Sequence, residues 1–133
     1  MSFGTPRYGL TRTLSDTSLE DAVPRVTAAL ATQGFGVLTT IDLAATLDKK
    51  LGVQVPPYTI LGACNPRYAH QAVQAEPGIG LLLPCNVVVA QEGDDVVVSA
   101  VDPEAMFSVV GRPEVAPIAT EVKQLLSAAL EAI

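Results

Sequence analysis

The feature that most constrains the fold is a pair of valine runs joined by a short polar turn. Residues 87–90 (Val-Val-Val-Ala) and 96–100 (Val-Val-Val-Ser-Ala) flank the sequence Glu-Gly-Asp-Asp at 92–95. β-Branched runs on either side of such a turn are typical of a β-hairpin. Because the apolar residues are consecutive rather than alternating, both faces of this hairpin need cover. Helices of one chain cover one face, and a second subunit is a candidate for the other.

The rest of the chain alternates strand-like and helix-like segments. Strands are predicted at residues 7–14, 35–40 and 58–63. Helices are predicted after the capping residues Ser18, Asp42, Asn65 and Asp102, and a terminal helix carries the apolar stripe Ile118, Val122, Leu125, Leu126, Ala129 and Leu130. Pro24 lies inside the first helix and predicts a kink rather than a break. Removal of the terminal helix should leave the chain insoluble or molten.

Uneven connections and a hairpin favour an α+β fold. We expect a mixed, mostly antiparallel sheet of about five strands with helices packed on it, in a single domain over residues 1–133. A doubly wound α/β fold is the alternative. The helix after Asn65 also predicts that the strands before and after it run parallel, because a helical crossover carries the chain back. Cys64 and Cys85 would then lie at opposite ends of the sheet, unless residues 77–83 recross it. We therefore expect neither an intrachain disulfide nor a metal shared by these two cysteines.

Composition limits the classes of function. With 49% hydrophobic and 17% charged residues, the chain of 133 residues is expected to fold as a soluble domain. The net charge of −6 argues against a nucleic-acid partner. No uncharged apolar stretch approaches the roughly 18 residues of a membrane helix, so no membrane partner is expected. The first residues lack the pattern of a secretory signal, which predicts a cytoplasmic location.

Several motifs together resemble a known prokaryotic family. They are Gly-Phe-Gly-Val-Leu at 34–38, Lys-Leu-Gly-Val at 50–53, Tyr-Thr-Ile-Leu-Gly-Ala-Cys-Asn-Pro at 58–66, Gly-Leu-Leu-Leu-Pro-Cys-Asn-Val-Val-Val at 80–89 and Val-Asp-Pro at 101–103. In order and spacing the chain is similar to the domain-of-unknown-function family 302. The resemblance implies a compact α+β domain, usually alone in its chain and dimeric, and it implies no activity. The two cysteines are characteristic of a subgroup of that family only.

Five side chains are candidates for binding a ligand: Tyr58, Cys64, Asn65, Cys85 and Asn86. A thiol just before a helix N-terminus can have a lowered pKa and react as a thiolate. The competing interpretation is that free cysteines are small buried hydrophobes, and that the asparagines cap helices and turns.

No catalytic, cofactor or metal site is assigned. Dinucleotide, Walker-type and nucleophile-elbow motifs are absent, and the carboxylates are scattered. His70, the only histidine, would need further ligands besides the cysteines to hold a metal, and we interpret it as solvated. Whether the protein is an enzyme stays open.

Two functional hypotheses follow. The first is a homodimeric module that binds a small molecule or a protein without catalysis. The second is a thiol protein that uses Cys64 and Cys85 for redox chemistry, sulfur handling or soft-metal binding. The partner or ligand itself is not identified by the sequence.

Overall fold

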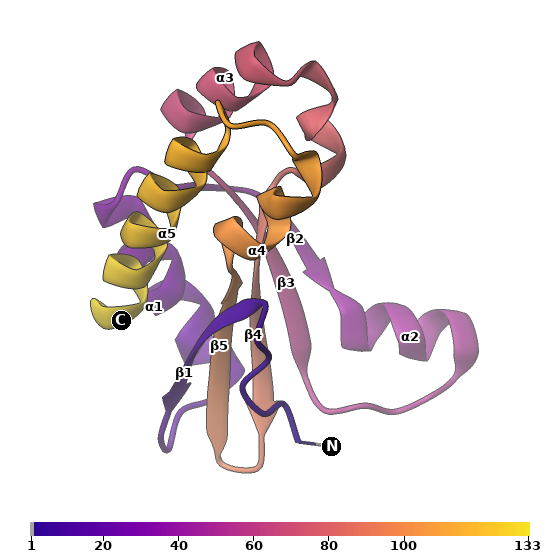
Figure 1. Ribbon diagram of the computed structural model, residues 1–133. Coiled ribbons are helices and arrows are strands. Elements are labelled where there is room, and N and C mark those ends of the chain that lie inside the picture. The colour runs from indigo at the N-terminus through magenta and orange to yellow at the C-terminus, as the bar shows by residue number, and fades with distance from the viewer. Residues whose placement is uncertain (1) are drawn as a thin grey trace.

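The computed structural model describes residues 2–133 and contains one five-stranded sheet (Figure 1). The strands are β1 (Gly9–Leu14), β2 (Gly36–Asp42), β3 (Tyr58–Cys64), β4 (Cys85–Glu92) and β5 (Asp95–Val101). The α-helices are α1 (Leu19–Thr32), α2 (Leu43–Leu51), α3 (Pro66–Ala75), α4 (Pro103–Phe107) and α5 (Ala116–Glu131), with 3₁₀ helices η1 (Pro77–Leu82) and η2 (Ser108–Val110). None of the helices in this part of the chain has the length and apolar character needed to span a membrane.

The sheet has the order β1-β5-β4-β3-β2, and every neighbouring pair of strands is antiparallel. The α+β prediction is therefore confirmed, and the doubly wound alternative, which needs parallel strands, is excluded. The valine hairpin forms as predicted, with Glu92 paired to Asp95 and Gly93 at the turn with a φ of +61°. A positive φ is a conformation that glycine adopts without steric cost.

The predicted direction of β4 is wrong. Strand β4 runs antiparallel to β3, and Ala63 pairs with Cys85. Helix α3 lies across the end of the sheet instead of running back along its face (Figure 1). The chain then passes through η1 and re-enters the sheet at the end from which β3 left. Cys64 and Cys85 consequently lie at the same end of the sheet, and both are free thiols.

One face of the sheet packs against helices and forms the core. Val87, Val89, Val96 and Val98 are fully buried on this face. Their helical partners include Val26 of α1 and Leu126 of α5, which are equally buried; removal of such side chains from water is the main driving force of folding.

Helix α1 continues through Pro24, and its first turn is capped by the Ser18 hydroxyl, which accepts a hydrogen bond from the amide of Asp21 at 3.1 Å.

The terminal helix forms as predicted. Of its expected stripe, Leu125 is partly buried and the other five residues are buried: Ile118, Val122, Leu126, Ala129 and Leu130.

Asp102 caps the neighbouring helix α4 by accepting from the amide of Glu104 at 2.9 Å. The Lys123 ammonium of α5 lies 3.0 Å from the Asp102 carboxylate, and the ion pairs with Asp102 and then Glu104 raise the pKa of this lysine. These contacts join α4 to α5.

The Arg12 side chain adds a polar link between edge strand β1 and the end of α5. The Arg12 guanidinium donates hydrogen bonds to the backbone carbonyls of Leu130, Glu131 and Ile133. The last carbonyls of a helix lack the regular hydrogen bonds of its interior, and a cation is favourable at the negative end of the helix dipole.

Replacement of Arg12 by alanine should lower the free energy of unfolding by roughly 1–3 kcal/mol, because a charged donor to several carbonyls is lost. Arg25, an exposed arginine on α1, is the matched control, and its alanine variant should stay within about 0.5 kcal/mol of the unmodified chain. Urea unfolding followed by circular dichroism measures both. Equal stabilities of the two variants would contradict this role of Arg12.

Candidate functional site

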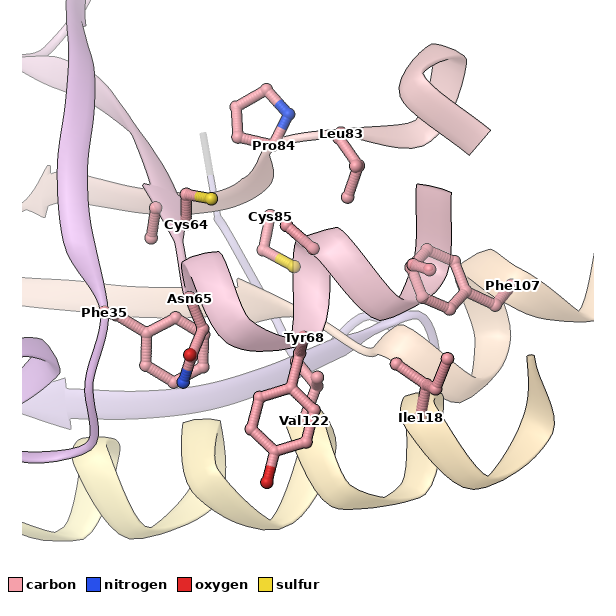
Figure 2. Close-up of a pocket in the computed structure, with 13 residues that line it drawn as sticks. Phe35, Cys64, Asn65, Tyr68, Leu83, Pro84, Cys85, Phe107, Ile118 and Val122 are labelled. Atoms are coloured by element: carbon pink, nitrogen blue, oxygen red, sulfur yellow. The ribbon is translucent and has the colours of Figure 1, made fainter. Parts of the chain in front are cut away.

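The structure distributes the five candidate residues between a small pocket at the end of the sheet and grooves on the face without core helices. Cys64, Asn65 and Cys85 line a pocket between the sheet end, α3 and α5 (Figure 2). Tyr58 and Asn86 instead belong to the face of the sheet that carries no core helix, and both line grooves there. The binding role of these five residues stays a prediction.

The pocket beside the cysteines is small and almost entirely apolar. Its lining includes Phe35, Tyr68, Phe107, Ile118 and Val122, and its volume is about 30 Å³. A cavity of this size has room for a water molecule, whereas sites for organic ligands usually measure several hundred Å³. Packing of the core therefore accounts for this pocket better than ligand binding does.

The two thiols are neighbours that face different sides of the sheet. Side chains alternate along a strand, so Cys64 shares the face of Gly62, while Cys85 pairs with Ala63 and faces the helices. In Figure 2 the Cys64 side chain extends toward Pro84, and the Cys85 sulfur points toward the helices. Burial, with a smaller contribution from Cys64, raises the pKa of the Cys85 thiol to about 11. A protonated thiol is neither a good nucleophile nor a metal ligand.

Asn65 occupies the N-cap position of α3 but does not cap it through its side chain. Its amide nitrogen donates instead to the carbonyl of Gln33 at 3.1 Å, across the turn between α1 and β2. Gly34, at this turn, has a φ of +85°, and a Cβ atom there would lie 3.1 Å from the same amide nitrogen. The predicted capping role is wrong, and Asn65 instead fastens the α1–β2 turn to the start of α3.

Two larger grooves lie on the opposite face of the sheet. The first, of about 340 Å³, runs between α2, the segment 55–58, the end of β4 and the N-terminal residues Ser2 and Phe3. The second, of about 320 Å³, lies between Tyr8 and the strand residues Asn86, Val88 and Ser99. Phe3 and Tyr58 line both grooves. Because the N-terminal segment lines both, it lies on this face and covers part of it.

Two polar side chains at the first groove, Gln91 and Glu92, form hydrogen bonds with different parts of the chain. The Gln91 amide nitrogen donates to the carbonyls of Thr17, Gly93 and Asp95 at 3.0–3.1 Å, and its oxygen accepts from the amide of Leu19 at 2.9 Å. Gln91 thus holds the hairpin turn against the start of α1. One oxygen of Glu92 accepts from the amide of Phe3 at 2.9 Å and anchors the N-terminal segment.

Sequence reasoning missed Phe3, Leu43, Leu47 and Glu92. Phe3 lies in a segment without any periodic pattern, and Glu92 was interpreted as part of a turn. Leu43 and Leu47 lie on the helix predicted after Asp42, and no residue of this helix is buried. His70 is exposed, and the described residues contain no group of three or more His, Cys, Asp or Glu side chains suited to a metal ion.

The comparisons with known proteins decide the family. The model of the domain of unknown function DUF302 matches residues 10–133, nearly the whole chain. The chain belongs to the DUF302 family. Among curated proteins, none matches it.

The DUF302 fold is shared with a solved structure. The crystal structure of an uncharacterized conserved DUF302 protein from Bacillus stearothermophilus has 26% sequence identity to this chain and a TM-score of 0.87. The match covers 96% of this chain and 98% of the Bacillus protein. Neither the family description nor this structure assigns an activity, so the resemblance inferred from the motifs is confirmed without adding a catalytic function.

The burial of Cys85 predicts unequal thiol reactivity in this DUF302 domain. At pH 8, iodoacetamide should modify Cys64 of the folded chain, while Cys85 reacts only after unfolding, because its thiol stays protonated and covered. Mass spectrometry of intact and digested protein counts and locates the labels. A Cys64→Ser variant is the control and should take up no label when folded. Rapid labelling of Cys85 in that variant would show that the site is open.

Proposed function

We propose that this DUF302 domain is a homodimeric binding module that acts in the cytoplasm of a prokaryote. One observation carries the proposal: strand β2 and helix α2 expose apolar side chains that do not pack against the rest of the described chain. The described residues assemble no catalytic motif, and the pKa and orientation of Cys85 do not favour the thiol alternative.

Strand β2 is an edge of the sheet without the usual protection. Its residues 36–41 carry no charge and no proline, and all but Val37 are exposed. A bulge between Val37 and Thr39 turns Leu38 out of register. Backbone amides and carbonyls on the outer side of an edge strand are free to pair with another strand. Such an edge favours association rather than a permanently isolated chain.

Helix α2 adds apolar surface next to this edge. Figure 1 shows that α2 projects away from the body of the domain. We define the edge patch as Leu38, Ile41, Leu51 and Val53, which are 70%, 42%, 70% and 42% exposed. These residues come from β2, from the end of α2 and from the loop after it. Large apolar side chains exposed beside a free sheet edge favour a protein interface there.

A second copy of the chain is the partner that this edge favours. Two identical β2 strands can pair antiparallel across a two-fold axis, and each then satisfies the outer backbone groups of the other. The strand carries no charge before Asp42, so like charges do not oppose the approach of two copies. Pairing would also bring each copy of α2 close to the partner and give its leucines a surface to cover.

The proposal predicts that Leu38→Glu abolishes the dimer, because two carboxylates would be placed in an apolar contact. Multi-angle light scattering at micromolar concentrations should give the mass of two chains for the unmodified protein and of one chain for the variant. Leu81→Glu is the matched control, because Leu81 is 92% exposed but lies on η1, away from the edge patch.

The control should remain a dimer, and circular dichroism should show both variants folded. A single-chain mass for the unmodified protein, or a dimer that survives Leu38→Glu as well as it survives Leu81→Glu, would overturn the proposal.

A further inference from the structure

We propose that the groove of about 340 Å³ between α2 and the N-terminal segment binds a small organic cation with an apolar body, such as an aromatic primary amine. This inference rests on the proposed binding role of the domain, but it does not require the dimer. We call this groove the cation groove, and it is lined by residues 2–3, Leu43, Leu47, 55–58 and 90–92.

The walls of the cation groove are apolar and come from four separate segments. Leu43 and Leu47 of α2 form one side, Val55 to Pro57 continue it, and Phe3 lies on the other. Both leucines and Phe3 are only half-buried, so the groove remains open to solvent. A volume of this size is in the range of small-molecule sites, which are mostly apolar with a few convergent polar groups. The apolar part of a ligand would be held here.

The charge of the cation groove comes from one side chain. Among its lining residues, Glu92 is the only acid, and there is no lysine, arginine or histidine. One Glu92 oxygen accepts from the amide of Phe3, but a carboxylate has about four acceptor positions, so capacity for a further donor remains. The Gln91 amide, in contrast, is already occupied by backbone partners. A cationic N–H donor therefore matches the free hydrogen-bonding capacity of the groove.

Two aromatic side chains strengthen the choice of a cation over an anion. Phe3 and Tyr58 line the groove together with Glu92, and aromatic faces attract ammonium groups. An anion would meet the Glu92 carboxylate with no cationic side chain among the described lining residues to balance it, in a chain whose net charge is −6. An apolar ligand without charge would gain the hydrophobic contacts alone. The combination of one carboxylate, two aromatic rings and aliphatic walls thus selects an amine with an apolar body.

The test uses three probes that share one apolar body: 2-phenylethylamine, 2-phenylethanol and 3-phenylpropionate. Isothermal titration calorimetry on the full chain should show that the amine binds about tenfold or more tightly than the alcohol, because hydrogen bonds between charged groups are roughly twice as strong as neutral ones. The carboxylate should bind weakest. Glu92→Gln keeps an acceptor for the amide of Phe3 and should weaken the amine about tenfold while leaving the alcohol unchanged.

Glu121→Gln is the matched control, because Glu121 is an exposed carboxylate on α5 and its removal should leave amine binding unchanged. Equal affinity for amine and alcohol, no binding of the amine, or equal loss in both variants would overturn the inference.

Light scattering on the same samples separates this inference from the proposed dimer. A dimer that does not bind the amine refutes only the cation groove, whereas a single chain that binds the amine refutes only the dimer. Conversion of the dimer to single chains by Glu92→Gln would indicate that the second copy occupies the groove. That result would also overturn the inference.

Discussion

The antiparallel pairing of β3 with β4 is the constraint on which the rest of the structure depends. Because Ala63 pairs with Cys85, the chain must leave and re-enter the sheet at the same end, and α3 with η1 forms the connection there. Strands β5 and β1 then follow on the side of β4, and β2 pairs on the side of β3. Helices α1 and α5 cover one face, while the opposite face is covered in part by the N-terminal segment.

Most elements could be predicted from the sequence because their signals are local. The valine runs, the Gly93 turn and the caps at Ser18, Asp42 and Asp102 each depend on neighbouring residues, and each appears where expected. The direction of β4 could not be predicted in the same way. A helix between two strands favours a parallel crossover, but α3 lies across the end of the sheet, and that placement depends on its packing with distant α5.

The arrangement of the candidate site residues could not be predicted for a related reason. The candidates Tyr58, Cys64, Asn65, Cys85 and Asn86 rest on residue type and local sequence, whereas their surroundings depend on the fold: Asn65 has a structural hydrogen bond and Cys85 is buried. The cation groove is formed where the N-terminal segment meets α2 and the end of β4, and these segments are distant in sequence. No periodic pattern marks Phe3 or Glu92. A family resemblance identified the fold, but a family without an assigned activity could not identify these side chains.

The central claim is that β2 is completed by a second chain. Hydrogen–deuterium exchange of the β2 amides that point away from β3 tests it most directly. If two copies pair through this edge, these amides should be protected at high protein concentration and lose protection on dilution, while the amides bonded to β3 stay protected throughout. Outward β2 amides that exchange as fast as unprotected loop amides at every concentration would contradict the account.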